Sequence, residues 1–296
     1  PLLSEASPES FLQAIEESLQ ADDSPILKMF ENPGDSFFNR AYYPNLLWAL
    51  ENLLISPVYL LRTTLILAKL DEVAPKGKLV NQPMNSLRET YIPWFGQTQA
   101  DLALKKTVIT TLSRIMPNTC WKLLLGILPN NHNIVGYIHQ CKWRFEPQKL
   151  KRSVAYEELF DFHSFILDKL LLLATDEEKK AQLISRYPDL SLKEREKLLK
   201  FFEESGPPIE NSQPFIWDRL RKILARHKEH SEQSWALPPE ELNKLEKIFN
   251  TLTPKDLKYK YKYLFEEQWP DFPDGAKRRG VSHEDSENYH DNRRLD

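Results

Sequence analysis

Hydrophobic residues recur along this chain at spacings of three and four, which is the pattern of amphipathic helices. The clearest stripe is formed by Leu242, Leu245, Ile248 and Phe249. Helices are predicted at residues 8–20, 25–30, 44–54, 57–70, 98–116, 118–128, 154–174, 176–187, 192–205, 214–230 and 239–250. The pattern predicts an all-α fold, an irregular array of antiparallel helical pairs of the TPR/HEAT-like α-solenoid type.

Several helix starts are marked by Ser-Pro or Thr-Pro pairs, because a hydroxyl can cap the first turn and proline is tolerated at its first position. These pairs are Ser7-Pro8, Ser24-Pro25, Ser56-Pro57 and Thr253-Pro254. Capping boxes are predicted at Thr175 with Glu178 and at Ser191 with Glu194. Gly206-Pro207-Pro208 is predicted to end the helix that follows Ser191.

The predicted helices and connections differ in their apolar and charged content. Apolar residues cover most of the circumference of helix 57–70, which predicts that it lies between neighbouring helices. Residues 71–97 are interpreted as a proline-rich connection with about one helical turn, and residues 129–153 as an extended loop around Trp143. Helices after residue 150 have more heavily charged faces. The predicted segments are therefore an array over 1–150, a charged continuation over 151–276, and a linker or disordered tail over 277–296.

Composition narrows the functional classes. The 296 residues include only 8 glycines but 21 prolines, which argues against β-hairpins and phosphate-binding loops. The formal net charge is −3, so no global basic field attracts nucleic acid or an anionic membrane. The two cysteines predict neither a disulfide framework nor a zinc site and favour a reducing cytoplasm. The longest apolar runs are far shorter than the ~20 residues that span a bilayer.

Candidate catalytic and metal-binding residues do not form a recognised pattern. Gly77-Lys78 lacks the preceding glycine of a phosphate loop, so this chain is not expected to bind ATP. His227 and His230 are three residues apart, not the four of a metalloprotease helix, and are interpreted as a solvated helix end. The sequence therefore predicts no catalytic residue, no cofactor and no metal. His132, His139 and Cys141 could share a metal, but a fourth ligand is missing. Cys120 lies in an apolar helix and is interpreted as a buried structural thiol, not a nucleophile.

Alternating lysine and tyrosine residues at 258–263 leave a second hypothesis open. Interleaved cations and aromatic rings can bind single-stranded nucleic acid. On a helix, however, Tyr259 and Tyr263 fall on one side with lysines beside them, which favours an aromatic core stripe. The basic cluster at 277–279 is followed by acidic residues and is interpreted as part of the solvated tail.

The most distinctive stretch lies between residues 81 and 144. It contains NQPMNSL at 81–87, IPWFGQTQA at 92–100, PNTCWKLLLGILP at 117–129 and CKWR at 141–144. These motifs, within residues 44–145, resemble a helical-array segment of the large bacterial antiviral STAND NTPases, which are NLR-like proteins. The resemblance implies a sensor or scaffold region of a larger protein, and the start at Pro1 without an initiator Met agrees with that expectation.

The residues within these motifs have predicted structural or interaction roles. Each of the three tryptophans Trp94, Trp121 and Trp143 is expected to cover a helix junction while its N–H finds a carbonyl. Trp121 is further expected to be buried together with Leu124, between the helix over 98–116 and a neighbouring pair. Asn81, Pro83 and Ser86 are expected to cap and stiffen the connection that precedes a short helix. Arg144 is expected to donate hydrogen bonds to carbonyl oxygens at a helix end.

The functional hypothesis is a non-catalytic sensor or scaffold that binds a protein partner, which the resemblance implies is a phage protein. In that case any ATP hydrolysis by the parent protein uses a site outside this chain, and the remainder of the parent chain is a further partner. Two alternatives remain open: a nucleic-acid-binding helical module, and a helical effector enzyme whose site is not recognised. A membrane partner is not expected.

Overall fold

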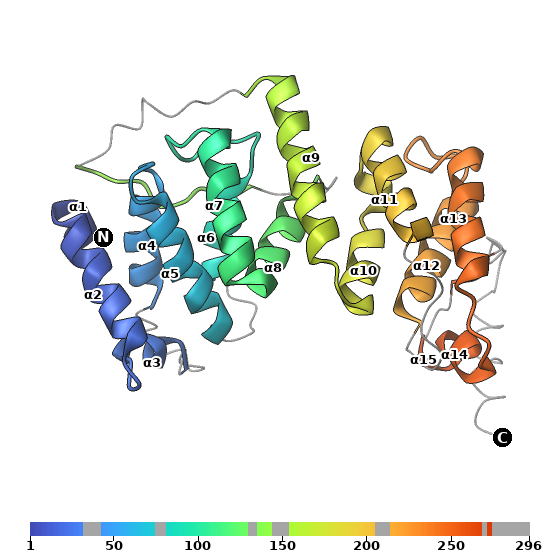
Figure 1. Ribbon diagram of the computed structural model, residues 1–296, viewed down its shortest axis with the longest axis horizontal. Helices are drawn as coiled ribbons and strands as arrows, with labels where there is room; N and C mark the ends of the chain where they lie inside the picture. Colours follow the sequence, from blue (N-terminus) through green and yellow to red (C-terminus); the bar gives the residue numbers. More distant parts are fainter. Residues whose placement is uncertain are drawn as a thin grey trace, which may run out of the picture. The chain divides into compact units, whose positions relative to one another are not determined.

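The computed structural model describes residues 1–31, 43–74, 81–129, 135–143, 154–204, 214–267 and 271–273 (Figure 1). Within these ranges all regular secondary structure is helical and no strand is present. The prediction of an all-α fold is therefore confirmed. Across the same ranges, no helix combines the length and the apolar character that crossing a bilayer requires.

The chain divides into two compact units, residues 1–173 and 174–296. The sequence predicts a boundary near residue 150, where the helix faces become more heavily charged. In the structure, α9 (Tyr156–Leu173) packs against α7 and α8 and belongs to the first unit. Its charged outer face resembles that of the later helices, whereas its buried residues, among them Phe162, Ile166 and Leu170, complete the first core. The helices of the first unit are α1 (Leu2–Ala6), α2 (Pro8–Gln20), α3 (Pro25–Glu31), α4 (Tyr43–Leu54), α5 (Leu60–Val73), α6 (Pro83–Tyr91), α7 (Leu102–Ile115), α8 (Pro117–Ile127) and α9.

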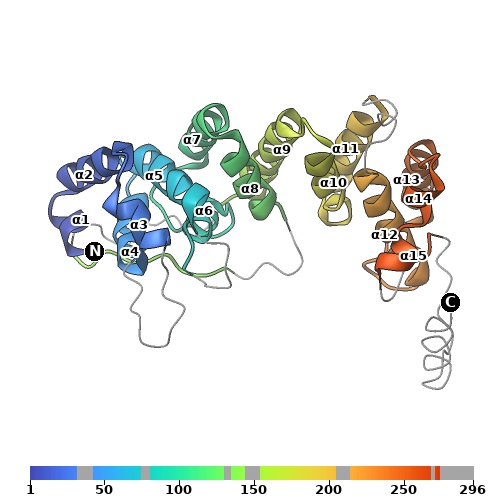
Figure 2. The same ribbon diagram turned by 90° about the horizontal axis from the view of Figure 1, so that it is seen from below.

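The first unit consists of two rows of helices. One row is formed by α1, α4, α6 and α8, and the other by α2, α5, α7 and α9, with each helix packed against the next in its row (Figure 2). Helix α5 contacts α2, α3, α4, α6, α7 and α8, so the prediction that this mostly apolar helix lies between neighbours is confirmed. The core between the rows includes Leu12, Leu50, Leu67, Leu87 and Leu124.

Helix α6 is longer than the single turn predicted between residues 71 and 97. Pro83 occupies its first turn, where the missing N–H needs no partner, and Met84, Leu87 and Tyr91 are buried. The spacing of these three residues is helical, but the surrounding prolines obscured it. Tyr91 is fixed by a hydrogen bond between its hydroxyl and that of Thr64 on α5 (2.8 Å).

Not every predicted start is a helix start. Helix α2 begins at Pro8, and Ser24 Oγ accepts from the backbone N–H of Leu27 (3.3 Å) at the start of α3. Helix α5, however, begins three residues after Pro57, because residues 57–59 form a turn. Thr253 does not begin a helix, since its hydroxyl donates to a carbonyl of the preceding helix.

The second unit contains α10 (Glu177–Ile184), a 3₁₀ turn (Tyr187–Asp189), α11 (Leu192–Glu204), α12 (Phe215–Glu229), α13 (Pro239–Thr251), α14 (Leu257–Tyr261) and α15 (Tyr263–Glu266). Asp176, not Thr175, caps α10 by accepting from Lys179 N (2.8 Å). At α11, Glu194 accepts from Ser191 N (2.9 Å), which is one half of the predicted capping box, and the Ser191 hydroxyl donates to the same carboxylate (2.7 Å). The predicted stripe of α13 is buried as expected. Gly206-Pro207-Pro208 lies outside the described residues.

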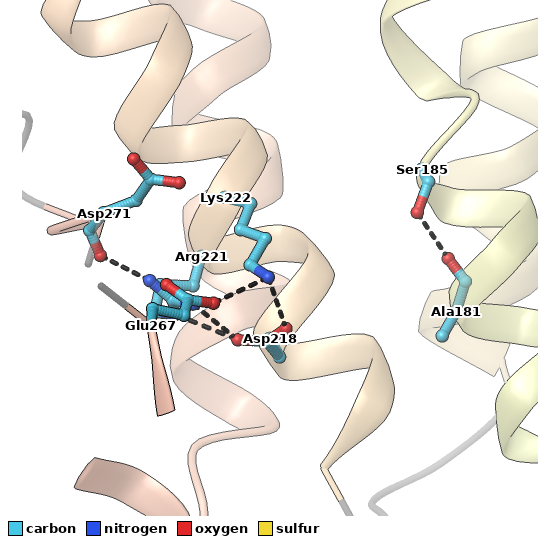
Figure 3. Close-up of polar contacts among 7 residues, drawn as sticks. All are labelled: Ala181, Ser185, Asp218, Arg221, Lys222, Glu267 and Asp271. Carbon is cyan, nitrogen blue, oxygen red and sulfur yellow. Dashed lines mark hydrogen bonds and ion pairs between the residues drawn. The ribbon is translucent and has the colours of Figure 1, made fainter. Parts of the chain in front are cut away.

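A buried arginine joins α15 and the chain after it to α12. The fully buried guanidinium of Arg221 donates to Asp218 (2.7 Å) and Glu267 (2.8 Å) and to the backbone carbonyl of Asp271 (Figure 3). Its face lies 3.9 Å from the ring centroid of Tyr263. Lys222 shares both carboxylates, so the paired charges compensate one another in a partly buried setting. In the same view, Ser185 Oγ donates to the Ala181 carbonyl on α10 (2.8 Å).

Candidate functional site

Residues 135–143 form an extended segment that runs along the row of α1, α4 and α6 (Figure 2). Their backbone groups are held by side chains from those helices and from the connection after α6. This is unusual, because most backbone groups in proteins pair with other backbone groups. The interpretation of this region as an extended loop agrees with the described part of it.

Gln97 binds the backbone of the first part of the segment. Its side-chain Nε2 donates to the Gly136 carbonyl (2.9 Å), and its Oε1 accepts from the Ile138 N–H (2.8 Å). A single side-chain amide thus pairs with two alternate backbone groups, as a neighbouring strand would. The same Nε2 also donates to the Glu89 carbonyl on α6 (3.1 Å), which fixes the amide in place.

Glu51 on α4 holds the centre of the segment. One carboxylate oxygen accepts from His139 N (2.7 Å), and the other accepts from the hydroxyl of Ser86 on α6 (2.5 Å). Burial raises the pKa of Glu51, and the bonds from Ser86 and His139 offset part of that rise. Ser86 therefore orients the carboxylate toward the segment, which differs from its predicted role as a cap.

Asn52 extends the same network. Its Nδ2 donates to Glu5 Oε1 (3.3 Å), so its Oδ1 is free to accept from His139 Nδ1 (2.8 Å). This arrangement requires the His139 tautomer that carries a proton on Nδ1. Cys141 donates its S–H to the Asn52 carbonyl (3.2 Å). Cys141 is buried and its pKa is raised to about 12, mainly by desolvation, so it is a poor nucleophile at neutral pH.

Glu5 on α1 holds the last part of the segment. Its carboxylate accepts from Lys142 N (3.1 Å) and from Trp143 N (2.7 Å). Glu5 is itself buried, and bonds to two successive N–H groups are the kind that stabilise a carboxylate away from water. The segment is thus held at its start, centre and end by different elements.

The side chains of the segment divide into buried and exposed sets. Ile138 and Cys141 are buried, whereas Tyr137 and Trp143 are 79% and 78% exposed. The exposure of Trp143 contradicts the prediction that it covers a helix junction. Its backbone N–H is held by Glu5, while its ring remains exposed. Trp48 on α4 stacks with His139 at 5.7 Å and is itself 38% exposed.

A cavity of about 310 Å³ lies beside the first part of the segment. It is lined by Asn81, Gln82, Asn85, Ser86, Arg88, Glu89 and Ile92 from the α6 region, by Glu51 and Gly126, and by residues 136–138. Burial raises the pKa of Glu89, and the Glu51 charge adds to the rise, while Arg88 and a hydrogen bond from the Gly136 backbone oppose it. Desolvation outweighs these opposing effects, so two poorly solvated carboxylates face one cavity.

The other predicted site residues have separate locations. Asn81 is exposed at the cavity edge, and Pro83 begins α6. Trp94 contacts His163 of α9 edge-on at 6.1 Å, which agrees with a junction role. Trp121 is 4% exposed in the core with Leu124, so the burial predicted for this pair is confirmed. Arg144 lies outside the described residues, as do Gly77-Lys78 and the segment 277–296.

The remaining chemical candidates are structural where they are described. His227 is buried rather than solvated, and its Nδ1 accepts from Leu237 N (3.0 Å). Cys120 is buried, with a pKa raised to about 12 mainly by desolvation. In the described part of the chain, no three His, Cys, Asp or Glu side chains converge as a metal site would need. His132 lies outside that part.

The sequence did not identify Glu5, Glu51, Asn52 or Gln97 as the residues that hold the segment. It did identify Ser86, which orients Glu51. A signal was available: Glu51 and Asn52 interrupt the apolar run of α4, and Glu5 lies in a short helix that the pattern did not predict. Comparison of the chain with models of protein families, with curated proteins and with solved structures finds no match.

Proposed function

We propose that this chain is a non-catalytic helical scaffold that binds a protein partner on the surface formed by residues 135–143 and α4. The observation that carries the proposal is the extended segment itself. Its backbone is held by Glu5, Glu51, Asn52 and Gln97 through bonds to main chain or ring, and its aromatic side chains are left exposed.

Exposed aromatic rings on a fixed backbone favour protein recognition. Tyrosine and tryptophan supply large contact areas with few rotatable bonds, and they are enriched among the residues that dominate binding energy. Tyr137 contacts Phe95 edge-on at 5.2 Å, and Trp48 stacks on His139, so these rings are already oriented. A partner would lose little additional side-chain freedom on binding them.

The resemblance of residues 44–145 to antiviral STAND NTPases extends the proposal. On that basis the chain is a sensor segment of a cytoplasmic bacterial defence protein, and its partner is a phage protein. The nucleotide site of such a protein would lie in another part of the parent. The coding sequence around this chain tests the extension, because a GxxxxGK[ST] loop followed by this segment is required.

Capture from lysates of phage-infected bacteria, followed by titration of the purified candidate, tests partner binding. We expect Tyr137→Ser combined with Trp143→Ser to weaken binding at least about thirtyfold, the effect of losing a residue worth about 2 kcal/mol. Tyr156→Ser is the matched control, because Tyr156 is an equally exposed ring on α9. Equal binding by the double variant and the control would contradict the proposal.

Titrations with ATP and with oligonucleotides separate the other classes. ATP turnover, or oligonucleotide binding that weakens steeply with salt and occurs without a protein partner, would replace the proposal. In the lysine–tyrosine stretch, Tyr263 packs against Arg221 and lies 6.3 Å from Trp217, so this ring is engaged within its unit. The predicted aromatic core stripe is wrong, because neither Tyr259 nor Tyr263 is buried, and Tyr261 is 42% exposed.

One observation favours an enzyme as the second candidate. Glu51 and Glu89 face a cavity with raised pKa values, and carboxyl groups of this kind can serve as general acids or bases. We favour binding because Glu51 belongs to the network that orders the segment, with one oxygen accepting from His139 N and the other from Ser86 Oγ on α6. Turnover of chromogenic esters, glycosides or phosphate esters that is lost in Glu89→Gln would favour the enzyme instead.

A further inference from the structure

The cavity beside the extended segment has a charge that its own residues do not balance. Glu51 and Glu89 form no ion pair with any other described residue. Arg88 also lines the cavity, so two carboxyl groups share one neighbouring cation there. Poorly solvated carboxylates without a full counter-charge favour a cationic guest.

The edge of the cavity favours a planar cation. Tyr137 lines the cavity and is largely exposed, and its edge-on contact with Phe95 leaves a ring available to a guest. A guanidinium group stacks on aromatic rings and donates to more than one carboxylate from its planar fork, whereas an ammonium group acts as a compact point charge. The volume of about 310 Å³ is at the low end of ligand pockets, which suits one side chain.

Gly126 sets the position of Arg88. A Cβ atom at residue 126 would lie 2.1 Å from Arg88 Nε, so the guanidinium lies directly over the glycine. Any larger residue at this position must push Arg88 away from α8. This gives a means of filling or distorting the cavity without changing its carboxylates.

We infer that this cavity binds the guanidinium group of an arginine residue on the protein partner, between Glu51 and Glu89 and against Tyr137. The inference rests on the proposed function and specifies the chemistry of the partner. The aromatic surface and the cavity are then parts of one interface, because Tyr137 belongs to both.

Short peptides test this inference with the full chain. Acetyl-Ala-Arg-Ala-amide is titrated into isotope-labelled protein, beside peptides that carry lysine or the uncharged analogue citrulline, and beside free arginine. We expect the arginine peptide to bind at least tenfold more tightly than the citrulline peptide. We also expect Glu89→Gln and Gly126→Ala each to weaken its binding at least tenfold. Glu157→Gln, a change at an exposed glutamate of α9, is the control and should have no effect.

Several outcomes would overturn the inference: equal binding of the arginine and citrulline peptides, no binding of either, or unchanged binding by Glu89→Gln in a folded variant. Tighter binding of free arginine than of the peptide would assign the cavity to a small molecule and also overturn it. Partner capture that depends on Tyr137 and Trp143 but not on Glu89 would leave the proposed function intact. Arginine-peptide binding without any captured partner would instead contradict the proposed function alone.

Discussion

Trp121 and Trp143 each follow a cysteine within two residues in the motif region, but one is buried and the other is exposed. Trp121 is 4% exposed in α8, whereas Trp143 is 78% exposed at the end of a segment that is held by its backbone. At the scale of single residues, burial therefore separates a structural role from a binding role. His227 is a further example: its position at a helix end predicted exposure, but its side chain is buried and has a structural role.

Replacement of these tryptophans tests that separation. Trp121→Ala should lower the free energy of unfolding by about 3–5 kcal/mol, because it leaves a large cavity in the core. Trp143→Ala should change it by less than about 0.5 kcal/mol, as exposed substitutions do. Chemical denaturation of both variants measures the difference. Similar stabilities would show that Trp121 does not support the core.

The buried His227 should make the free energy of unfolding depend on pH. Desolvation, aided by Arg226 and other nearby cations, lowers its pKa to about 4, from the usual value of about 6.5. Between these pH values the unfolded chain binds a proton that the folded chain does not. The free energy of unfolding should therefore fall as pH falls from about 6.5 to 4, by at most about 3 kcal/mol.

The variant His227→Asn should reduce this dependence, because the amide oxygen can accept from Leu237 N but does not titrate in this range. Thermal unfolding at several pH values between 4 and 7.5 measures it. His230→Asn is the comparison, since His230 is exposed and has the smallest effect among the charges that lower the pKa of His227. If His227→Asn and the unmodified protein lose stability equally over this window, the neutral buried histidine is not its source.

At the scale of elements, the extended segment and the helices under it depend on one another. Residues 135–143 form no regular structure of their own, and their order comes from Glu5, Glu51, Asn52 and Gln97. The polar positions of α1, α4 and α6 that would otherwise be buried without partners are satisfied by the segment. A change in either part should therefore alter the other.

Gln97→Ala tests this dependence. It removes the bonds to the Gly136 carbonyl and the Ile138 N–H, so amide exchange at Ile138 and His139 should accelerate by about tenfold or more. Hydrogen exchange followed by mass spectrometry or NMR measures the rates. Gln13→Ala, at an exposed position of α2, should leave them unchanged. Unchanged exchange in Gln97→Ala would mean that the segment is held by its buried side chains alone.

At the scale of the whole molecule, two units have separate cores. Helix α9 completes the first, since Phe162, Ile166, Leu167 and Leu170 are buried and the helix contacts α7 and α8. The core of the second includes Trp217, which stacks on Phe249 at 5.1 Å. A division after residue 173 therefore leaves each core within one fragment.

Truncation distinguishes this division from one near residue 150. The fragment 1–173 should give a helical circular dichroism spectrum and a cooperative thermal transition. The fragment 1–150 should melt at least about 10 °C lower or aggregate, because removal of α9 exposes the apolar residues of α7 and α8. Equal behaviour of the two fragments would show that α9 is not part of the first core.

Local features of the sequence were enough to predict the all-α class and most helix positions. Apolar spacing, proline in first turns and scarce glycine determine helix formation over a few residues, so their effect can be predicted without a structure. The buried pair Trp121 and Leu124 followed from the same periodicity. The exceptions include Pro57 and Thr253, where a local signal had more than one structural outcome, and the helices α1 and α6, of which the first was not predicted and the second was predicted too short.

Only the tertiary structure decided which polar residues act together. Glu5 meets the backbone of Trp143, and Glu51 meets that of His139, across separations of 138 and 88 residues. No local pattern distinguishes a carboxylate that binds a distant backbone from one that faces water, because both occupy polar positions on a helix. The path of the chain back along α6, α4 and α1 brings these residues together, and it creates the cavity and the exposed aromatic surface.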